Sequence, residues 1–291
     1  MKVSFHSTVL FYFIIVCLCA CRSSQTNRPT VSVSILPQKY FIERIAKEEV
    51  KVNVMIPPGM NPATCDLNIG QLKDLYNSDV YFAIGNLPFE QTHLYPVLTR
   101  KPEILLIRHS DSLSLLAGSC GHHHSHPGES VDPHIWLSPA YALHICQQIV
   151  ETLSRKYPDK RDFFTANYNE LKADIDLFAQ EATNVLSTQK NRAFLIYHPA
   201  LTYFAHDYGL EQISIEEEGK EPHPAHLKEI VDEARNKSIS VIFIQKQFDI
   251  KNAEAVARST ASRIVPIDPL NENWLEEMYH LLQVFRENSS D

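Results

Sequence analysis

Three short segments of the chain carry side chains that could bind a metal ion. DPHIWLSP contributes His134, YHPALTYFAHDYG contributes His198, and VPIDPL contributes Asp268. Two imidazoles and one carboxylate suit zinc, manganese or iron, whereas magnesium prefers oxygen ligands alone. These residue types therefore indicate a transition-metal site, provided that the fold brings them together.

The positions of His198 and Asp268 favour a shared site. Each follows an apolar segment with the composition of a buried strand, at residues 193–197 and 263–267. In open α/β sheets, ligands bind just beyond the carboxyl ends of the strands. A histidine or aspartate before proline is also common in turns. Each residue alone is therefore a weak signal, and only their combination predicts a binding site.

Short apolar segments alternate with stretches of helical spacing along the whole chain. This alternation is typical of parallel sheets with helices on their faces. Residues 159–191 contain neither glycine nor proline, and a helix of about 28 residues there would be about 40 Å long, enough to cross between two lobes. The predicted fold is therefore α/β, with two lobes of mainly parallel sheets at residues 31–157 and 191–291, joined by one long bridging helix at residues 158–190.

Residues 1–21 have the pattern of a bacterial lipoprotein signal peptide. Lys2 precedes an apolar run at residues 9–18, which is too short to span a bilayer. The run leads into Leu-Cys-Ala-Cys, which resembles the lipobox, so Cys21 is expected to carry the lipid and residues 22–30 to form a polar tether. We expect the mature protein to be extracytoplasmic, in the periplasm or at the cell surface, and anchored to the membrane through this lipid only.

Composition and missing motifs exclude several functions. The net charge of −8 argues against nucleic acid as a partner. Because Gly-x-x-x-x-Gly-Lys-Ser/Thr is absent, any ATPase that acts with this protein must be a separate chain. The absence of His-Glu-x-x-His and Gly-x-Ser-x-Gly argues against an enzyme of the common hydrolase types. The expected mature chain keeps three cysteines besides the anchor, an odd number, so no disulfide framework is predicted.

Several segments resemble, in the same order, those of the substrate-binding receptors of bacterial zinc and manganese ABC importers: SILPQKYFIERIA, MIPPGMNP, DPHIWLSP, YHPALTYFAHDYGL, EGKEPHPAHLKEIV, VIFIQKQF and IVPIDPL. They run through almost the whole mature chain, and DPHIWLSP is the most specific. The resemblance implies a monomer that binds Zn(II), or alternatively Mn(II), with high affinity. It further implies delivery of the ion to a membrane permease. It places His134, His198 and Asp268 on three of the family's four usual ligand positions.

The fourth ligand position departs from the family pattern. The family usually has a histidine directly after the proline of PPGxxP, and here that residue is Ala63, which cannot ligate. Water, Cys65, Asp66 or a histidine from the loop His122–His126 are the alternatives, and a thiolate would favour zinc over manganese. Zinc-type members of the family often carry a histidine-rich loop just before DPHIW, so we expect this loop to capture zinc with low affinity.

Three other functions fit the same pattern. A manganese-specific receptor or an adhesin would use the same scaffold, and the sequence does not separate either from a zinc receptor. An extracellular zinc hydrolase would also use three protein ligands and a water molecule. The missing catalytic motifs make the hydrolase the weaker hypothesis.

Overall fold

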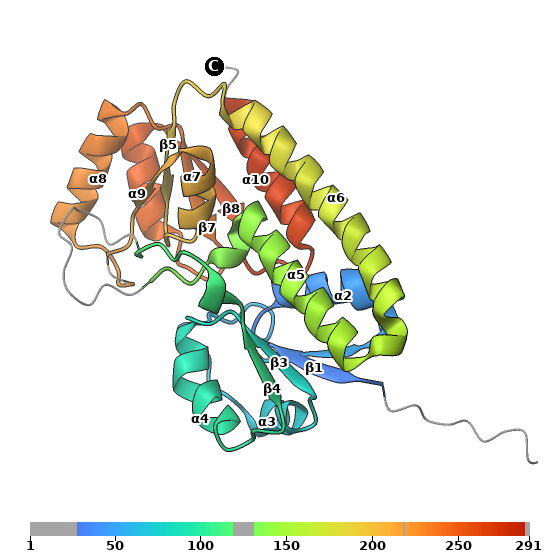
Figure 1. The fold of residues 1–291 in the computed structure, drawn as a ribbon. Helices are drawn as coiled ribbons and strands as arrows, with labels where there is room; N and C mark the ends of the chain where they lie inside the picture. Colours follow the sequence, from blue (N-terminus) through green and yellow to red (C-terminus); the bar gives the residue numbers. More distant parts are fainter. Residues whose placement is uncertain (1–27, 119–130, 218, 289–291) are drawn as a thin grey trace, which may run out of the picture.

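A computed structural model describes residues 28–118, 131–217 and 219–288, and its strands form two separate parallel sheets (Figure 1). The expected signal peptide with Cys21, most of the tether, Cys120 and the histidine-rich loop lie outside the described residues. Within those residues, no helix combines the length and the apolar character needed to cross a membrane.

The two sheets have the same strand order. The first is β2-β1-β3-β4 and the second is β6-β5-β7-β8, with all neighbours parallel. The central strands are almost completely buried, as expected where helices cover both faces. This arrangement confirms the predicted fold class. The strands are β1 (Thr30–Val33), β2 (Lys51–Val54), β3 (Val80–Ala83), β4 (Leu105–Arg108), β5 (Ala193–Ile196), β6 (Glu211–Ser214), β7 (Val241–Gln245) and β8 (Arg263–Ile267).

Most connections between the strands are helical. The Ser138 hydroxyl accepts a hydrogen bond from the Tyr141 N–H at 3.2 Å, and Pro139 follows as the first residue of α5, the arrangement expected at a helix start. The helices are α2 (Leu36–Ala46), α3 (Ile69–Tyr76), α4 (Tyr95–Leu98), α5 (Pro139–Lys156), α6 (Arg161–Leu186), α7 (Thr202–Tyr208), α8 (Pro224–Asn236), α9 (Lys251–Thr260) and α10 (Trp274–Asn288). Short 3₁₀ or π turns are η1 (Lys47–Glu49), η2 (Glu90–Leu94), η3 (His109–Ser112), η4 (Ile135–Leu137) and η5 (Pro158–Lys160).

The helix α6 packs against both halves of the chain. It has 26 residues, which corresponds to about 39 Å. It contacts α2 and α5 of the first half and α7 and α10 of the second (Figure 1). Its buried residues are Phe164, Leu171, Ile175, Phe178, Ala182 and Leu186. The long bridging helix is therefore present, while the lobe boundaries at residues 157 and 190 stay predictions.

Two buried tryptophans connect segments that are far apart in the sequence. Trp136 Nε1 donates a hydrogen bond to the Pro269 carbonyl at 2.7 Å, and Trp274 Nε1 donates to the Trp136 carbonyl at 2.8 Å. Trp274 also packs edge-on against Phe41 of α2, with ring centroids 5.2 Å apart. Loss of either bond would leave a buried polar group unpaired. The segment at residues 132–139 is therefore fixed to the residues that follow β8.

His109, which directly follows β4, is fully buried. Its ring stacks on Phe82 with centroids 5.7 Å apart, and Nδ1 lies 2.6 Å from Gln148 Oε1. Nε2 has no hydrogen-bond partner within the described residues. Burial lowers the pKa of His109 to about 4, although the hydrogen bond with Gln148 acts in the opposite direction. The folded protein thus keeps this ring neutral over a pH range in which the unfolded chain protonates it.

This buried imidazole predicts that the fold is sensitive to acid. The unfolded chain binds the proton below a pH of about 6.5, whereas the folded protein does so only near a pKa of about 4. His109 therefore does not affect the free energy of unfolding above the unfolded pKa of about 6.5. As the pH falls from there toward the folded pKa of about 4, the free energy of unfolding decreases by up to about 3 kcal/mol. We expect His109→Phe, which keeps an aromatic ring against Phe82, to remove most of this loss.

Urea unfolding at a series of pH values between about 7 and 4.5, with a chelator present, measures the effect. The exposed His206 provides the control, since His206→Gln should leave the pH profile of the wild type unchanged. Parallel profiles for the wild type and His109→Phe would contradict the prediction.

Candidate metal site

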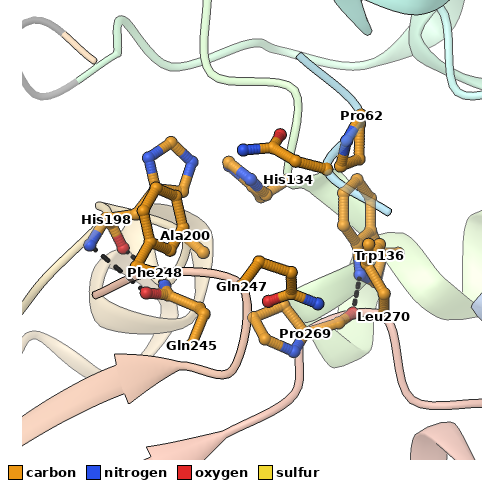
Figure 2. A pocket seen from close by; sticks show the side chains of 11 residues that line it. Pro62, His134, Trp136, His198, Ala200, Gln245, Gln247, Phe248, Pro269 and Leu270 are labelled. Atoms are coloured by element: carbon orange, nitrogen blue, oxygen red, sulfur yellow. Dashed lines mark hydrogen bonds between the residues drawn. The ribbon is translucent and has the colours of Figure 1, made fainter. Parts of the chain in front are cut away.

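A small pocket lies at the loops that follow strands of both sheets (Figure 2). Its volume is about 50 Å³, which has room for an ion with a few water molecules, because a cavity needs about 10–15 Å³ of such space to hold one water. The loops follow β2, β5, β7 and β8, and η4 completes the lining: Asn61, Pro62, His134, Trp136, His198, Ala200, Gln245, Gln247, Phe248, Pro269 and Leu270. The pocket thus lies where ligands bind in α/β proteins.

Two of the predicted ligands, His134 and His198, lie side by side in this pocket. Their ring centroids are 5.3 Å apart and the ring planes meet at 71°. The ring of His134 contacts Trp136 at a centroid distance of 5.2 Å, and the ring of His198 stacks on Phe248 at 5.3 Å. These aromatic neighbours restrict the rotation of both imidazoles.

Each histidine has a buried carboxylate behind it. His134 Nδ1 lies 2.8 Å from Asp132 Oδ1, and His198 Nδ1 lies 2.7 Å from Glu216 Oε1. An ionised carboxylate only accepts hydrogen bonds, so each Nδ1 acts as the donor and each neutral ring keeps its lone pair on Nε2. Asp132 and Glu216 are 3% and 6% exposed, so water competes little for these bonds. The two Nε2 atoms are therefore the nitrogens that a metal ion can use.

The charge of Asp132 is stabilised in place. Burial acts to raise the pKa of its carboxyl group, but the positive charge that the His134 ring carries when it is protonated, and hydrogen bonds from His134 and Thr202, outweigh burial and lower the pKa below its usual value. The His134 N–H also donates to Asp132 Oδ1 at 2.7 Å. The carboxylate therefore holds both the backbone and the ring of His134.

The position of Glu216 follows from the register of the second sheet. β5 and β6 are parallel neighbours with Ile196 opposite Ser214. His198 and Glu216 each stand two residues further along, so they leave the sheet side by side. The buried Gln245 at the end of β7 completes this support, since its amide accepts from the His198 N–H at 3.3 Å and donates to the His198 carbonyl at 2.7 Å.

Asp268, the third predicted ligand, points to other partners. Its Oδ2 lies 3.7 Å from Lys246 Nζ, and its Oδ1 accepts from the Leu270 N–H at 3.2 Å. The two residues that follow it, Pro269 and Leu270, line the pocket. Within the described ranges, no three histidine, cysteine, aspartate or glutamate side chains gather closely enough to hold an ion. A role of Asp268 as a ligand therefore stays a prediction.

Of the alternatives for the fourth ligand, the two side chains that the structure describes, Cys65 and Asp66, are not in the pocket. Asn61 Oδ1 accepts from the Ala63 N–H at 2.8 Å, which closes a turn in this loop. Cys65 is a buried free thiol whose pKa is raised by burial. Asp66 is exposed and lies 3.4 Å from His93 Nε2. Neither Cys65 nor Asp66 lines the pocket, and the loop His122–His126 lies outside the described residues.

Sequence reasoning missed several residues of the site. Asp132 could have been found, because Asp-Pro-His is a compact turn in which the aspartate can reach the histidine. Glu216 stands in an acidic run, and only the pairing of β5 with β6 distinguishes it from the solvated residues beside it. Gln245 and Gln247 belong to no metal-binding pattern, so no sequence signal marks them.

The fold and the pocket define a two-lobed α/β binding protein with an ion-sized site. The family described as "Zinc-uptake complex component A periplasmic", ZnuA, matches residues 31–289, and the chain belongs to this family. A crystal structure of ZnuA has a TM-score of 0.82 and 31% identity, covering 90% of this chain and 99% of that one. A zinc-bound deletion mutant of ZnuA has a TM-score of 0.81 and 32% identity, covering 90% and 98%.

A curated relative is the zinc-binding lipoprotein AdcA of Streptococcus pneumoniae serotype 4. It is 24% identical over an alignment of 273 residues that covers 89% of this chain and 53% of AdcA. The chain thus spans about half the length of the AdcA proteins that it matches. The resemblance to metal-binding receptors is therefore confirmed at the level of the family.

The pairing of His198 with Glu216 predicts a fixed tautomer. In the neutral ring, the hydrogen should be on Nδ1 because the carboxylate accepts it. We expect Glu216→Leu, which keeps the volume and removes the acceptor, to let His198 populate both tautomers while His134 is unchanged. Long-range ¹H–¹⁵N correlation spectra of metal-free protein above about pH 8 distinguish the two forms. An unchanged His198 pattern in the variant would show that Glu216 does not set the tautomer.

Proposed function

We propose that this chain is the extracytoplasmic receptor of an ABC importer, that it binds one transition-metal ion, and that it passes the ion to the importer's permease. One observation carries the proposal. Two facing imidazoles, each with its Nδ1 bound to a buried carboxylate, line an ion-sized pocket. Histidines that ligate metals almost always have such a partner, which fixes the ring and makes the other nitrogen more basic.

The ligand set favours Zn(II), with Mn(II) as the alternative cargo. His134 and His198 would each supply Nε2, and Asp268 would join them by turning away from Lys246. Imidazole nitrogens suit zinc, while a carboxylate is shared by zinc and manganese sites. A pocket of about 50 Å³ is far smaller than the ~300–1,000 Å³ of sites for organic ligands. The size therefore supports an ion as the cargo.

A zinc hydrolase has less support. Among the described residues that line the pocket, none is an aspartate or glutamate. Such a carboxylate is the usual general base that activates a zinc-bound water in hydrolases that carry His-Glu-x-x-His. Asp132 and Glu216 lie on the Nδ1 side of their histidines, away from the nitrogens that would hold the ion. We therefore propose a binding protein that is not an enzyme.

The location and partners belong to the same proposal. AdcA is described as a zinc-binding lipoprotein, which supports a lipid on Cys21 and a tether at residues 22–30. Such an anchor would keep the receptor, as a monomer, beside a permease that is driven by an ATPase on another chain. The bridging helix would join the lobes at residues 31–157 and 191–291, and the cargo would be bound between these two lobes.

The first test is metal binding by protein stripped with a chelator. We expect calorimetry to show one tight Zn(II) per chain and a weaker Mn(II). His134→Ala and His198→Ala should each weaken Zn(II) binding by more than about 100-fold, since even the loss of an outer partner costs about 10–100-fold. His206→Ala, which alters an exposed histidine outside the pocket, is the control. If both pocket variants bind zinc like the wild type, the proposed site is wrong.

A second test concerns Asp268 and its ion pair with Lys246. If Asp268 joins the bound ion, Asp268→Asn should weaken binding about 10-fold or more, because a charged ligand is lost. Lys246→Met should strengthen binding, because it removes a cation that competes with the metal ion for Asp268. The gain should be only about 2- to 5-fold, since an exposed ion pair contributes little free energy. The gain should shrink in high salt. Unchanged affinity in Asp268→Asn would exclude Asp268 as a ligand.

A further inference from the structure

We propose that the side-chain oxygen of Gln247 coordinates the bound ion and supplies the donor that Ala63 cannot. This inference rests on the proposed function, because it names a further ligand for the same ion. It concerns the end of β7 and the turn that follows it, which contribute Gln245, Gln247 and Phe248 to the pocket.

The loop after β7 sends alternate side chains in different directions. Gln245 and Gln247 line the pocket, while Lys246 between them is exposed and pairs with Asp268. Phe248 stacks on the ring of His198. Figure 2 shows Gln247 between Phe248 and Pro269, below the rings of His134 and His198. The Phe248 N–H donates to the Gln245 carbonyl at 3.1 Å, so residues 245–248 form a turn that brings this amide into the same pocket as the imidazoles.

The amide of Gln247 differs from the other two amides of the pocket. Gln245 uses both ends of its amide on the backbone of His198. The oxygen of Asn61 accepts from the Ala63 N–H. Gln247 makes no hydrogen bond to another described residue. A half-buried amide without a partner has unused donors and an unused acceptor, so it is free to turn its oxygen toward a cation.

The chemistry of this donor has a consequence for the choice of metal. An amide oxygen is a neutral, hard ligand of the kind that suits manganese as well as zinc, whereas an additional imidazole would favour zinc. A site with two imidazoles and an amide therefore discriminates less between the two ions than one with three imidazoles. Gln247 is thus a specificity-determining residue for the cargo.

The test uses a matched pair of variants. Gln247→Leu removes the oxygen and keeps a similar volume, while Gln247→Glu keeps an oxygen at the same reach and adds a negative charge. We expect Gln247→Leu to weaken Zn(II) binding about 10-fold or more and Mn(II) binding at least as much. Gln247→Glu should bind both ions at least as tightly as the wild type. Calorimetry on the metal-stripped mature chain measures this, and thermal unfolding without metal checks the fold.

Cobalt(II) absorption adds a direct view of the coordination sphere. With Co(II) bound, the d–d bands of Gln247→Leu should differ from those of the wild type, because one ligand is exchanged for water. Equal affinities and equal spectra would overturn the inference. A weaker affinity with an unchanged spectrum would also overturn it, since Gln247 would then act only through a metal-bound water.

The outcomes separate this inference from the proposed function. If the wild type binds no metal, or if His134→Ala and His198→Ala bind like the wild type, the proposed site itself fails. If those variants lose binding while Gln247→Leu keeps wild-type affinity and spectrum, only the role of Gln247 fails. A rise in the preference for zinc over manganese in Gln247→His would support the assigned role in specificity.

Discussion

The two hydrogen bonds made by Trp136 and Trp274 are the constraint on which the pocket depends. One runs from the segment of His134 to the carbonyl of Pro269, and the other returns to the carbonyl of Trp136. Each would cost about 1–3 kcal/mol to break without a new partner. Because His134 stands two residues before Trp136 and Asp268 directly precedes Pro269, the same contact sets the backbone positions of both residues.

The other side of the pocket is set by parallel strand pairing. The register of β5 with β6 brings Glu216 behind His198, and the end of β7 supplies Gln245, which binds the backbone of His198. These contacts come from three strands of one sheet, so His198 is held without any contribution from a long loop. The pocket therefore contains one histidine, His134, whose segment is held by indole hydrogen bonds. The other, His198, is held at the carboxyl end of a parallel sheet.

Much of this arrangement follows from local sequence patterns. Alternating apolar segments predict the two parallel sheets, and the ends of these segments identify His198 as a candidate ligand. Other features depend on information that such patterns lack. The role of Glu216 requires the strand order, and the direction of the Asp268 carboxylate depends on Lys246, which follows a different strand. Gln247 becomes a candidate only when its unused amide is found among the residues that line the same pocket as the two imidazoles.

The helix α6 also bears on how an ion would enter and leave. Since it packs against helices of both halves and spans about 39 Å, the halves cannot swing apart without breaking contacts along its length. With the halves packed on α6 in this way, rotations of side chains such as Lys246, Gln247 and Asp268 are the smallest movements that would open the proposed site to an ion. If the proposed site holds the ion, its residence time would then depend on a few torsion angles of these three side chains, and a partner that takes up the ion would need to move only them.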